Sequence, residues 1–234
     1  DVGVGFGIHV GVHAQADRRL FAQANGHLAQ HIEFGFAFHV EAADAHFQCA
    51  GHFRPRFAHA GEDGALRVAP GGQHPHMATH NRLLGLGDLY LEVIAADPAQ
   101  PAPAWPRWFD LDNFSGPPRL TNWVARCDDL AAELALSPAG TGTPTQLQRG
   151  DYRWQMAIPA TGKLPYDGAF PALIQWQGPL HPARALPESG CRLTRIEIAH
   201  PEGATLAAHL APRLTDPRVV FTTGPRAMQA TFST

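Results

Sequence analysis

Residues 71–98 read GGQHPHMATHNRLLGLGDLYLEVIAADP, and this stretch predicts the β-hairpin around which the fold is organised. Two apolar runs, Leu83–Leu86 and Leu89–Ala95, are separated by Gly-Asp at 87–88, a dipeptide typical of a tight turn between antiparallel strands. A single carboxylate, Glu92, lies inside the second run. In one interpretation it belongs to a ligand or metal site; in the other it points to solvent from the open face of a half-buried strand.

The register of this hairpin determines which polar group shares a face with Glu92. A polar cluster precedes the first run, and its imidazole and amide side chains are candidate ligands beside an acid. The cluster consists of His74, His76, Thr79, His80 and Asn81. With a two-residue turn, Leu83 lies opposite Glu92 and Asn81 joins it on that face. A turn that is one residue longer exchanges the faces and brings His80 beside Glu92. The sequence leaves both Asn81 and His80 open as the neighbour.

Length and charge narrow the classes of function. The chain has 234 residues, a mass of 25.3 kDa, a net charge of −3 and a pI near 6.5. We therefore expect no nucleic-acid or membrane partner, because no basic field is present and no apolar run approaches the roughly 20 residues of a membrane span. We also expect no secretory leader, because no charged and then apolar stretch opens the given sequence. Position 1 is Asp rather than Met, so a fragment is one interpretation. Three widely spaced cysteines favour a reducing, cytoplasmic location.

The first 66 residues differ in composition from the rest. They hold eight of the 14 histidines and eight of the 13 phenylalanines, but one proline and three leucines. Alternating apolar residues predict strands over 2–12 and 32–40, and the pattern between them predicts a helix over 17–28. The histidines suggest metal binding, although no acid or thiol partner repeats at ligand spacing. Our hypothesis is that residues 1–66 are an atypical segment, out of frame or poorly ordered.

The remainder predicts an α+β fold of paired βαβββ modules. A Pro-rich crossing at 98–118 contains Trp105 and Trp108, and its prolines at 98, 101, 103 and 106 exclude a helix or a central strand. After it we expect a strand over 120–127, a helix over 129–136 capped by Asp128, and a hairpin around Arg149-Gly150. The rest of the chain predicts strands over 171–176 and 191–201 with a loop over 178–190 between them, a helix over 205–214, and a closing strand pair over 218–234. The first module is incomplete or altered at its N-terminus, and the sheets form a partly open barrel around a shared cavity.

Four motifs in this order resemble the glyoxalase-like domain of the vicinal oxygen chelate superfamily. They are the stretch 71–98, then PRWFDLD, then LTNWVARCDDL, then PALIQW followed by HP, LP and GC. The similarity covers about residues 68–234, with module one at about 68–98 and module two at 119–234. It implies a divalent metal held by His and Glu side chains from the barrel strands. The chemistry it implies is isomerisation, lyase, dioxygenase or thiol transfer on vicinal oxygens of a substrate.

Carried over by position, Glu92 matches the acidic residue at the end of the first module. Glu92 and His80 are then the expected metal ligands and catalytic residues. The family's first strand and helix should lie just before Val68, where the sequence shows no match. Asn122 stands where a ligating member more often has His, and Glu197 is a candidate second carboxylate.

Other side chains are expected to bind substrate. Each also has a structural interpretation, as a packed core aromatic, a turn histidine or a surface arginine. Three functions are open. The first is an enzyme that acts on a small oxygen-rich molecule, with or without help from a metal ion. The second is a metal-free protein that binds or sequesters such a molecule, and the third is a damaged gene product without function. The expected partners are a small-molecule ligand and a second copy of the chain in a homodimer. The substrate-binding candidates are Asn81, Arg153, Trp154, Trp176 and His181.

Overall fold

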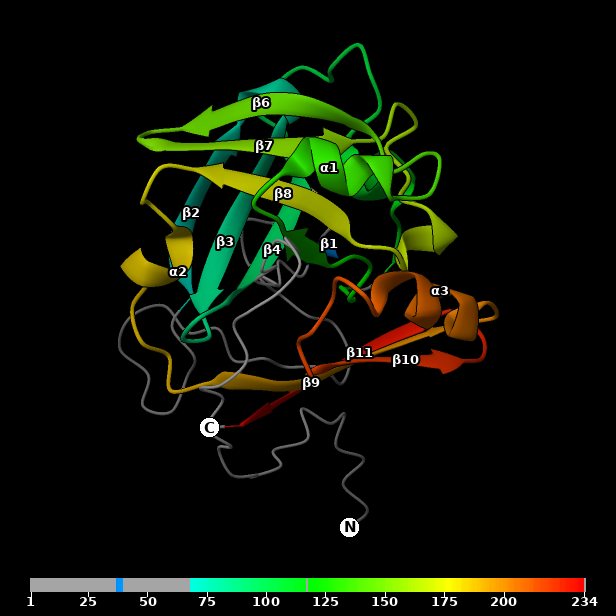
Figure 1. Ribbon diagram of the computed structural model, residues 1–234. Helices are drawn as coiled ribbons and strands as arrows, with labels where there is room; N and C mark the ends of the chain where they lie inside the picture. Colours follow the sequence, from blue (N-terminus) through cyan, green and yellow to red (C-terminus); the bar gives the residue numbers. More distant parts are fainter. Residues whose placement is uncertain (1–36, 40–67, 117, 234) are drawn as a thin grey trace.

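The computed structural model describes residues 37–39, 68–116 and 118–233, and it folds as three β-sheets with few helices (Figure 1). The predictions for 2–12 and 17–28, and most of the segment 1–66, lie outside the described residues. Sheet A holds β1 (Ala37–His39), β2 (Ala69–His74), β3 (Thr79–Gly85) and β4 (Tyr90–Ala96); sheet B holds β5 (Val124–Arg126), β6 (Thr143–Arg149), β7 (Tyr152–Ile158) and β8 (Ala172–Gln177); and sheet C holds β9 (Arg192–His200), β10 (Val219–Thr223) and β11 (Ala227–Ser233).

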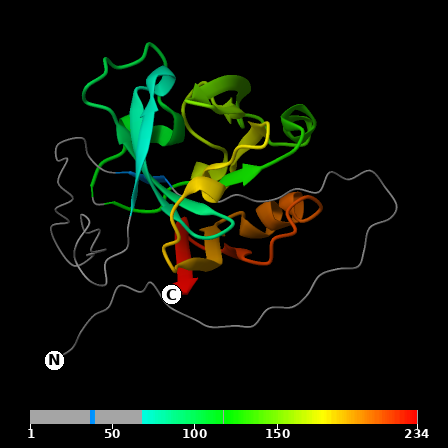
Figure 2. The ribbon, with the colours of Figure 1, turned by 90° about the vertical axis from the view of Figure 1, so that its left-hand side faces the viewer.

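Sheets A and B repeat one strand order. Sheet A runs β1-β4-β3-β2 and sheet B runs β5-β8-β7-β6. In each sheet the first strand pairs in parallel with the last, and the other neighbours pair antiparallel. This repetition confirms the predicted α+β fold of paired modules, and the sheets do not close into a barrel. The two sheets face each other in the view of Figure 2.

The first strand of sheet A lies farther upstream than the family pattern predicted. It was expected directly before Val68, but β1 occupies 37–39, where its backbone pairs with residues 92–94 of β4. This position lies within the alternating stretch 32–40, so the strand prediction there is confirmed for these three residues. Sequence spacing misjudged the distance because a parallel partner is placed by the sheet and not by its separation along the chain.

The β3–β4 hairpin has the register of a two-residue turn. Leu83 lies opposite Glu92, and Asn81 lies opposite Ile94. Leu86 N–H donates to the Leu89 carbonyl at 2.9 Å, and Gly87 has φ of +86°, a conformation that favours glycine. The faces are therefore set as the shorter turn predicted, with Asn81 and Glu92 together.

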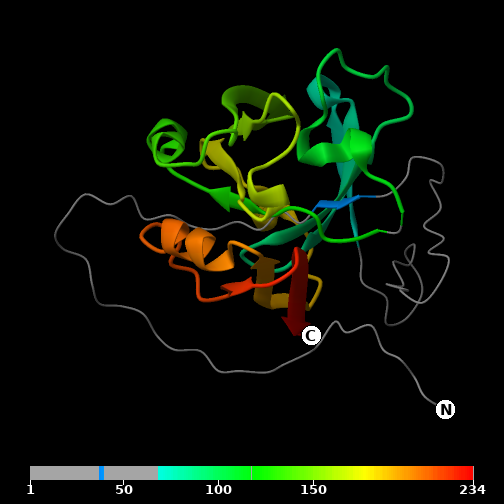
Figure 3. The same cartoon turned by 90° about the vertical axis from the view of Figure 1, so that its right-hand side faces the viewer.

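Sheet C corrects the prediction of a closing strand pair. β10 and β11 do not pair with each other; they flank β9, with β10 parallel and β11 antiparallel to it. Helix α3 (Gly203–Leu210) connects β9 to β10 and lies beside the sheet (Figure 3). A helical crossover allows the parallel pairing that a short loop could not. The segment expected to form module two, residues 119–234, therefore contributes to two sheets, sheet B and sheet C.

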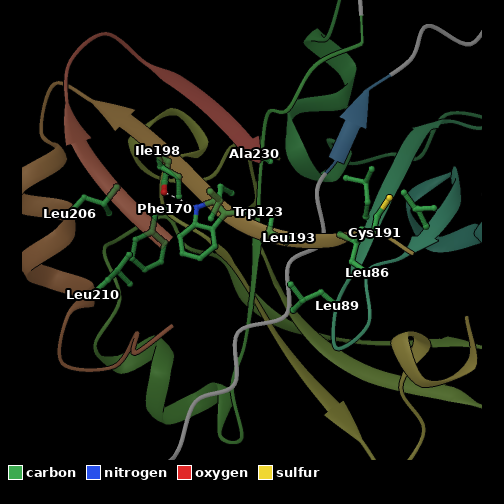
Figure 4. Close-up of a cluster of buried hydrophobic side chains, with 14 residues drawn as sticks. Leu86, Leu89, Trp123, Phe170, Cys191, Leu193, Ile198, Leu206, Leu210 and Ala230 are labelled. Atoms are coloured by element: carbon green, nitrogen blue, oxygen red, sulfur yellow. Dashed lines mark hydrogen bonds between the residues drawn. The ribbon is translucent and has the colours of Figure 1, made fainter. Parts of the chain in front are cut away.

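The largest core joins sheet C to the turn end of the β3–β4 hairpin (Figure 4). Leu86 and Leu89 of the turn, Ile198 of β9 and Leu206 of α3 are all buried in it. Trp123 is fully buried there and donates its indole N–H to the Ala169 carbonyl at 2.9 Å. This core fixes the hairpin at one end and leaves its other end to face sheet B.

The helices are short. Helix α1 (Leu130–Ala135) begins one residue later than expected, since Asp129 rather than Asp128 accepts the capping hydrogen bond, from Ala132 N–H. Helix α2 (Pro182–Ala185) forms in the segment predicted as loop. The 3-10 segments are η1 (Pro75–Met77), η2 (Trp108–Asn113) and η3 (Tyr166–Gly168). In the part of the chain that the structure describes, every helix is too short or too polar to cross a membrane.

Candidate functional site

A cavity lies between sheets A and B. Alternate residues of β3 and β4 point into it from sheet A, which is the period-two pattern of strands that present one face to a pocket. Its volume open to water is about 40 Å³, which is on the order of three water molecules at about 10–15 Å³ each. Sheet A contributes His74, Asn81, Leu83, Tyr90 and Glu92; sheet B contributes Val124, Arg149, Trp154, Met156, Ile174 and Trp176; and Trp108, Phe109 and Pro182 complete the wall.

A hydrogen-bonded network crosses this cavity from one sheet to the other. Asn81 Nδ2 donates to Glu92 Oε1 at 2.6 Å. Asn81 Oδ1 accepts from the main-chain N–H of Gly72 at 2.8 Å and from Arg149 Nη1 at 3.1 Å. Because both donors point at its oxygen, the Asn81 amide has a single orientation, with its NH₂ group toward Glu92. The other carboxyl oxygen, Oε2, has no hydrogen-bond partner among the described residues.

Two glycines make room for this network. A Cβ at Gly71 would overlap Asn81 Oδ1 and the Asn81 main chain, and a Cβ at Gly72 would lie 2.5 Å from Arg149 Cδ. The β2–β3 register also shifts between Pro70 and Gln73, which marks an irregularity at these glycines. The Gly-Gly pair that opens the stretch 71–98 therefore allows the amide and the guanidinium to approach the strand.

Glu92 is a carboxyl group with little water around it. Its side chain is half-buried and keeps its remaining exposure beside the cavity that it lines. Desolvation raises the pKa of Glu92 above its usual range, and this outweighs the Asn81 hydrogen bond and the charge of Arg149, which both lower it. A raised pKa makes the Glu92 carboxyl hold its proton more firmly than an exposed carboxyl does, which is the direction that general acid–base chemistry by a carboxyl group requires.

His74 is a second titratable group on the cavity wall. Its ring lies edge-on to Trp108 at 5.1 Å and to Trp154 at 6.4 Å between centroids, and Nδ1 lies 3.2 Å from Thr79 Oγ1. Burial, with smaller effects from Arg149 and a second histidine, lowers the pKa of His74 to about 3. The imidazole is therefore neutral at physiological pH.

Three of the predicted substrate-binding residues lie at or beside the cavity. Trp154 and Trp176 both line it, with ring centroids 5.3 Å apart. His181 is buried behind the wall, where it packs edge-on against Trp176 and lies 5.9 Å from the Tyr90 ring. With Asn81, these residues place most of the predicted binding set around one space.

Other predicted residues are not brought to the cavity. His80 is exposed on the opposite face of β3 from Asn81, so the structure does not bring it together with Glu92. Arg153 is exposed on β7, and its Nη1 lies 3.5 Å from the Asp151 carbonyl. Glu197 belongs to sheet C, where it bonds Arg195 at 2.8 Å. Asn122 precedes β5 and donates to Thr121 Oγ1. Alternation on a strand leaves two faces open, and these residues occupy the wrong face or the wrong sheet.

The donors around Glu92 do not fit a metal centre. Among the described residues, no three His, Cys, Asp or Glu side chains form a group able to hold an ion. A metal ion at Glu92 would need a second ligand, but the side chain that sheet B brings near is the guanidinium of Arg149. It is linked to the Glu92 carboxyl through Asn81, which bonds both groups. A fixed cation near the carboxylate opposes a divalent ion.

Sequence reasoning missed Arg149 and His74 as cavity residues. Arg149 was read only as part of a turn, and His74 only as one of several polar residues before a strand. The usable signal for Arg149 was the Gly-Gly pair at 71–72, since two small residues in a strand mark a close approach by another group. Sheet B decides which group approaches these glycines. Its Arg149 lies 68 residues after Asn81 along the chain, so no local pattern connects the two.

The fold and site define an α+β protein with two like-ordered sheets around a cavity that holds one desolvated carboxyl group. The family model for the glyoxalase-like domain matches residues 39–214, so the chain belongs to the glyoxalase-like domain family, consistent with the vicinal oxygen chelate superfamily. The match begins within the atypical segment 1–66. A hypothetical protein from Staphylococcus aureus, known from a crystal structure, is similar at 12% identity and a TM-score of 0.49, over 76% of this chain and 73% of that chain. No curated protein matches the chain.

Proposed function

We propose that the protein binds a small oxygen-rich molecule in the cavity between sheets A and B and that Glu92 exchanges a proton with it. The observation that carries this proposal is the state of Glu92. One oxygen of the carboxyl is fixed by Asn81, the other has no partner among the described residues, and desolvation raises the pKa of the group. An acid or base must be held in place and its pKa must shift toward the working pH; the Asn81 hydrogen bond supports the first condition, and the upward direction of the pKa shift supports the second.

The walls support a small ligand with a polar end. Trp154 and Trp176 supply apolar surface, while Asn81, Arg149 and His74 supply groups that hydrogen-bond oxygen. Few convergent polar groups in an apolar cavity are typical of small-molecule sites. The limited volume favours a molecule of a few heavy atoms over a conjugate or polymer.

Hydrogen–deuterium exchange tests the proposal without knowledge of the full reaction. Hydroxyacetone, pyruvate and glycolate are incubated with the protein in D₂O, and loss of their C–H signals is followed by proton NMR. Binding is followed in parallel by the fluorescence of the cavity tryptophans. We expect wild-type protein to bind at least one probe and to exchange a proton next to its carbonyl or hydroxyl carbon. Glu92→Gln should bind but not exchange, and Glu197→Gln should behave as wild type.

The outcomes separate the candidate functions. Binding without exchange in wild-type protein would refute the proton-transfer role and leave a binding protein. No binding of any probe would refute the whole proposal. Metal analysis of the same preparations tests the metal-assisted version: stoichiometric ion that is lost in Glu92→Gln would support it.

A further inference from the structure

We infer that the cavity ligand carries a carboxylate and that Arg149 binds this group. The inference rests on the proposed function, since it requires a ligand between sheets A and B, and it adds the chemical class of that ligand. It is carried by the hydrogen-bond donors that the cavity presents.

Arg149 lies at the end of β6 with its side chain half-buried at the cavity wall. Its guanidinium has five N–H donors, and one nitrogen, Nη1, bonds Asn81 Oδ1 at 3.1 Å. In the described part of the chain, no carboxylate lies within ion-pair distance of Arg149. Five other arginines do pair with acidic side chains: Arg107, Arg192, Arg195, Arg213 and Arg218. A cation on a cavity wall that no carboxylate contacts directly is suited to bind an anionic ligand.

A carboxylate matches the donors that Arg149 has left. It offers two oxygens with several acceptor positions to the N–H groups of the guanidinium that do not bond Asn81.

The charges facing the cavity favour an anion at the Arg149 end. The titratable and charged side chains that line it are His74, Tyr90, Glu92 and Arg149. His74 is neutral, since its pKa is lowered to about 3. Glu92 is bonded by Asn81 and not by Arg149. The guanidinium is therefore the one positive group on the described wall, and a ligand carboxylate placed beside it leaves the rest of the ligand toward Glu92.

The size of the cavity narrows the class. Space for about three water-sized groups accommodates little more than a carboxylate without movement of the walls. The smallest acids that carry a hydroxyl group, such as glycolate, come closest to this size and bring a second oxygen for the proton exchange proposed for Glu92.

Matched pairs of probes test the inference. The dissociation constants of formate, acetate and glycolate are compared with those of the neutral analogues formamide, acetamide and glycolamide, by titration of tryptophan fluorescence and by ligand NMR. Each is measured for wild-type protein, Arg149→Gln, Arg149→Lys and Arg153→Gln. The last variant removes an exposed arginine from the neighbouring strand and is the control for lost charge.

We expect wild-type protein to bind at least one acid at least about tenfold more tightly than its neutral analogue. Arg149→Gln should lose this preference, Arg149→Lys should keep part of it, and Arg153→Gln should keep all of it. Thermal melts establish that each variant is folded, and the lysine variant retains the test if the glutamine variant is not. Equal binding of acids and neutral analogues, or a preference unchanged in Arg149→Gln, would overturn the inference while the proposed function stands. Absence of binding by both classes would overturn the proposed function itself.

Discussion

Replacing Glu92 by glutamine is expected to stabilise the folded protein at neutral and alkaline pH. Glutamine has nearly the same shape and still accepts the hydrogen bond that Asn81 Nδ2 donates at 2.6 Å. What the substitution removes is the cost of keeping an ionised carboxylate in a desolvated position. A residue suited to proton transfer would then be one that lowers stability, as is common at functional sites.

The pH dependence of the free energy of unfolding follows from the direction of the Glu92 pKa shift. In the folded protein the pKa of Glu92 is raised from 4.5, so the folded state holds a proton more firmly than the unfolded state. Wild-type stability therefore falls as pH rises from about 4.5 through the folded pKa, by about 1.4 kcal/mol for each pH unit that separates the two values. Below that window the carboxyl is protonated in both states, and Glu92→Gln should differ little from wild type.

Urea unfolding at a series of pH values from 4 to 8.5 measures this difference. The control is Glu197→Gln, whose side chain is 41% exposed and pairs with Arg195 on the surface of sheet C. It should change the free energy of unfolding by less than about 0.5 kcal/mol at every pH. If Glu92→Gln destabilises the protein at pH 8, or if its effect does not depend on pH, the desolvated carboxyl group described here is wrong.

Three further predictions concern residues around the site and in the core. Gly71→Ala should lower the free energy of unfolding by about 1–3 kcal/mol, because its Cβ would meet the Asn81 main chain. Gly72→Ala should lower it less, since its Cβ meets the flexible side chain of Arg149, which can move. Equal urea midpoints for the two variants would contradict this prediction. His74→Phe should reduce the loss of stability on acidification between pH 6.5 and about 3, where unfolded but not folded His74 takes up a proton, by up to about 1.4 kcal/mol per pH unit; unfolding curves that stay parallel to wild type over this range would refute it. Burial raises the pKa of Cys127 to about 12, so iodoacetamide at pH 8 should label this thiol only after unfolding, and mass spectrometry that finds it modified in native protein would argue against its buried position.

The sequence by itself determined the elements whose signals are local. Gly-Asp at 87–88 between two apolar runs predicted the hairpin and narrowed its register to two alternatives, because the period of two ties every side chain to the turn length. The order of motifs from 71 to 191 indicated a resemblance to the family, which the match of the family model confirms. Helix α1 was recognised by its acidic cap and apolar stripe, with an error of one residue at the cap.

Tertiary structure decided the site, because the site is made of contacts between strands that lie far apart along the chain. The choice of Asn81 over His80 as the neighbour of Glu92 required the observed register. The role of Arg149 required sheet B to face sheet A, since Arg149 reaches Asn81 across 68 residues of sequence. Likewise β10 and β11 read as a hairpin along the chain but flank β9 in space. A local sequence pattern predicts whether a residue favours a strand or a helix and which residues share its side of that element. Its contact partners depend on packing between distant segments, which a local pattern does not encode.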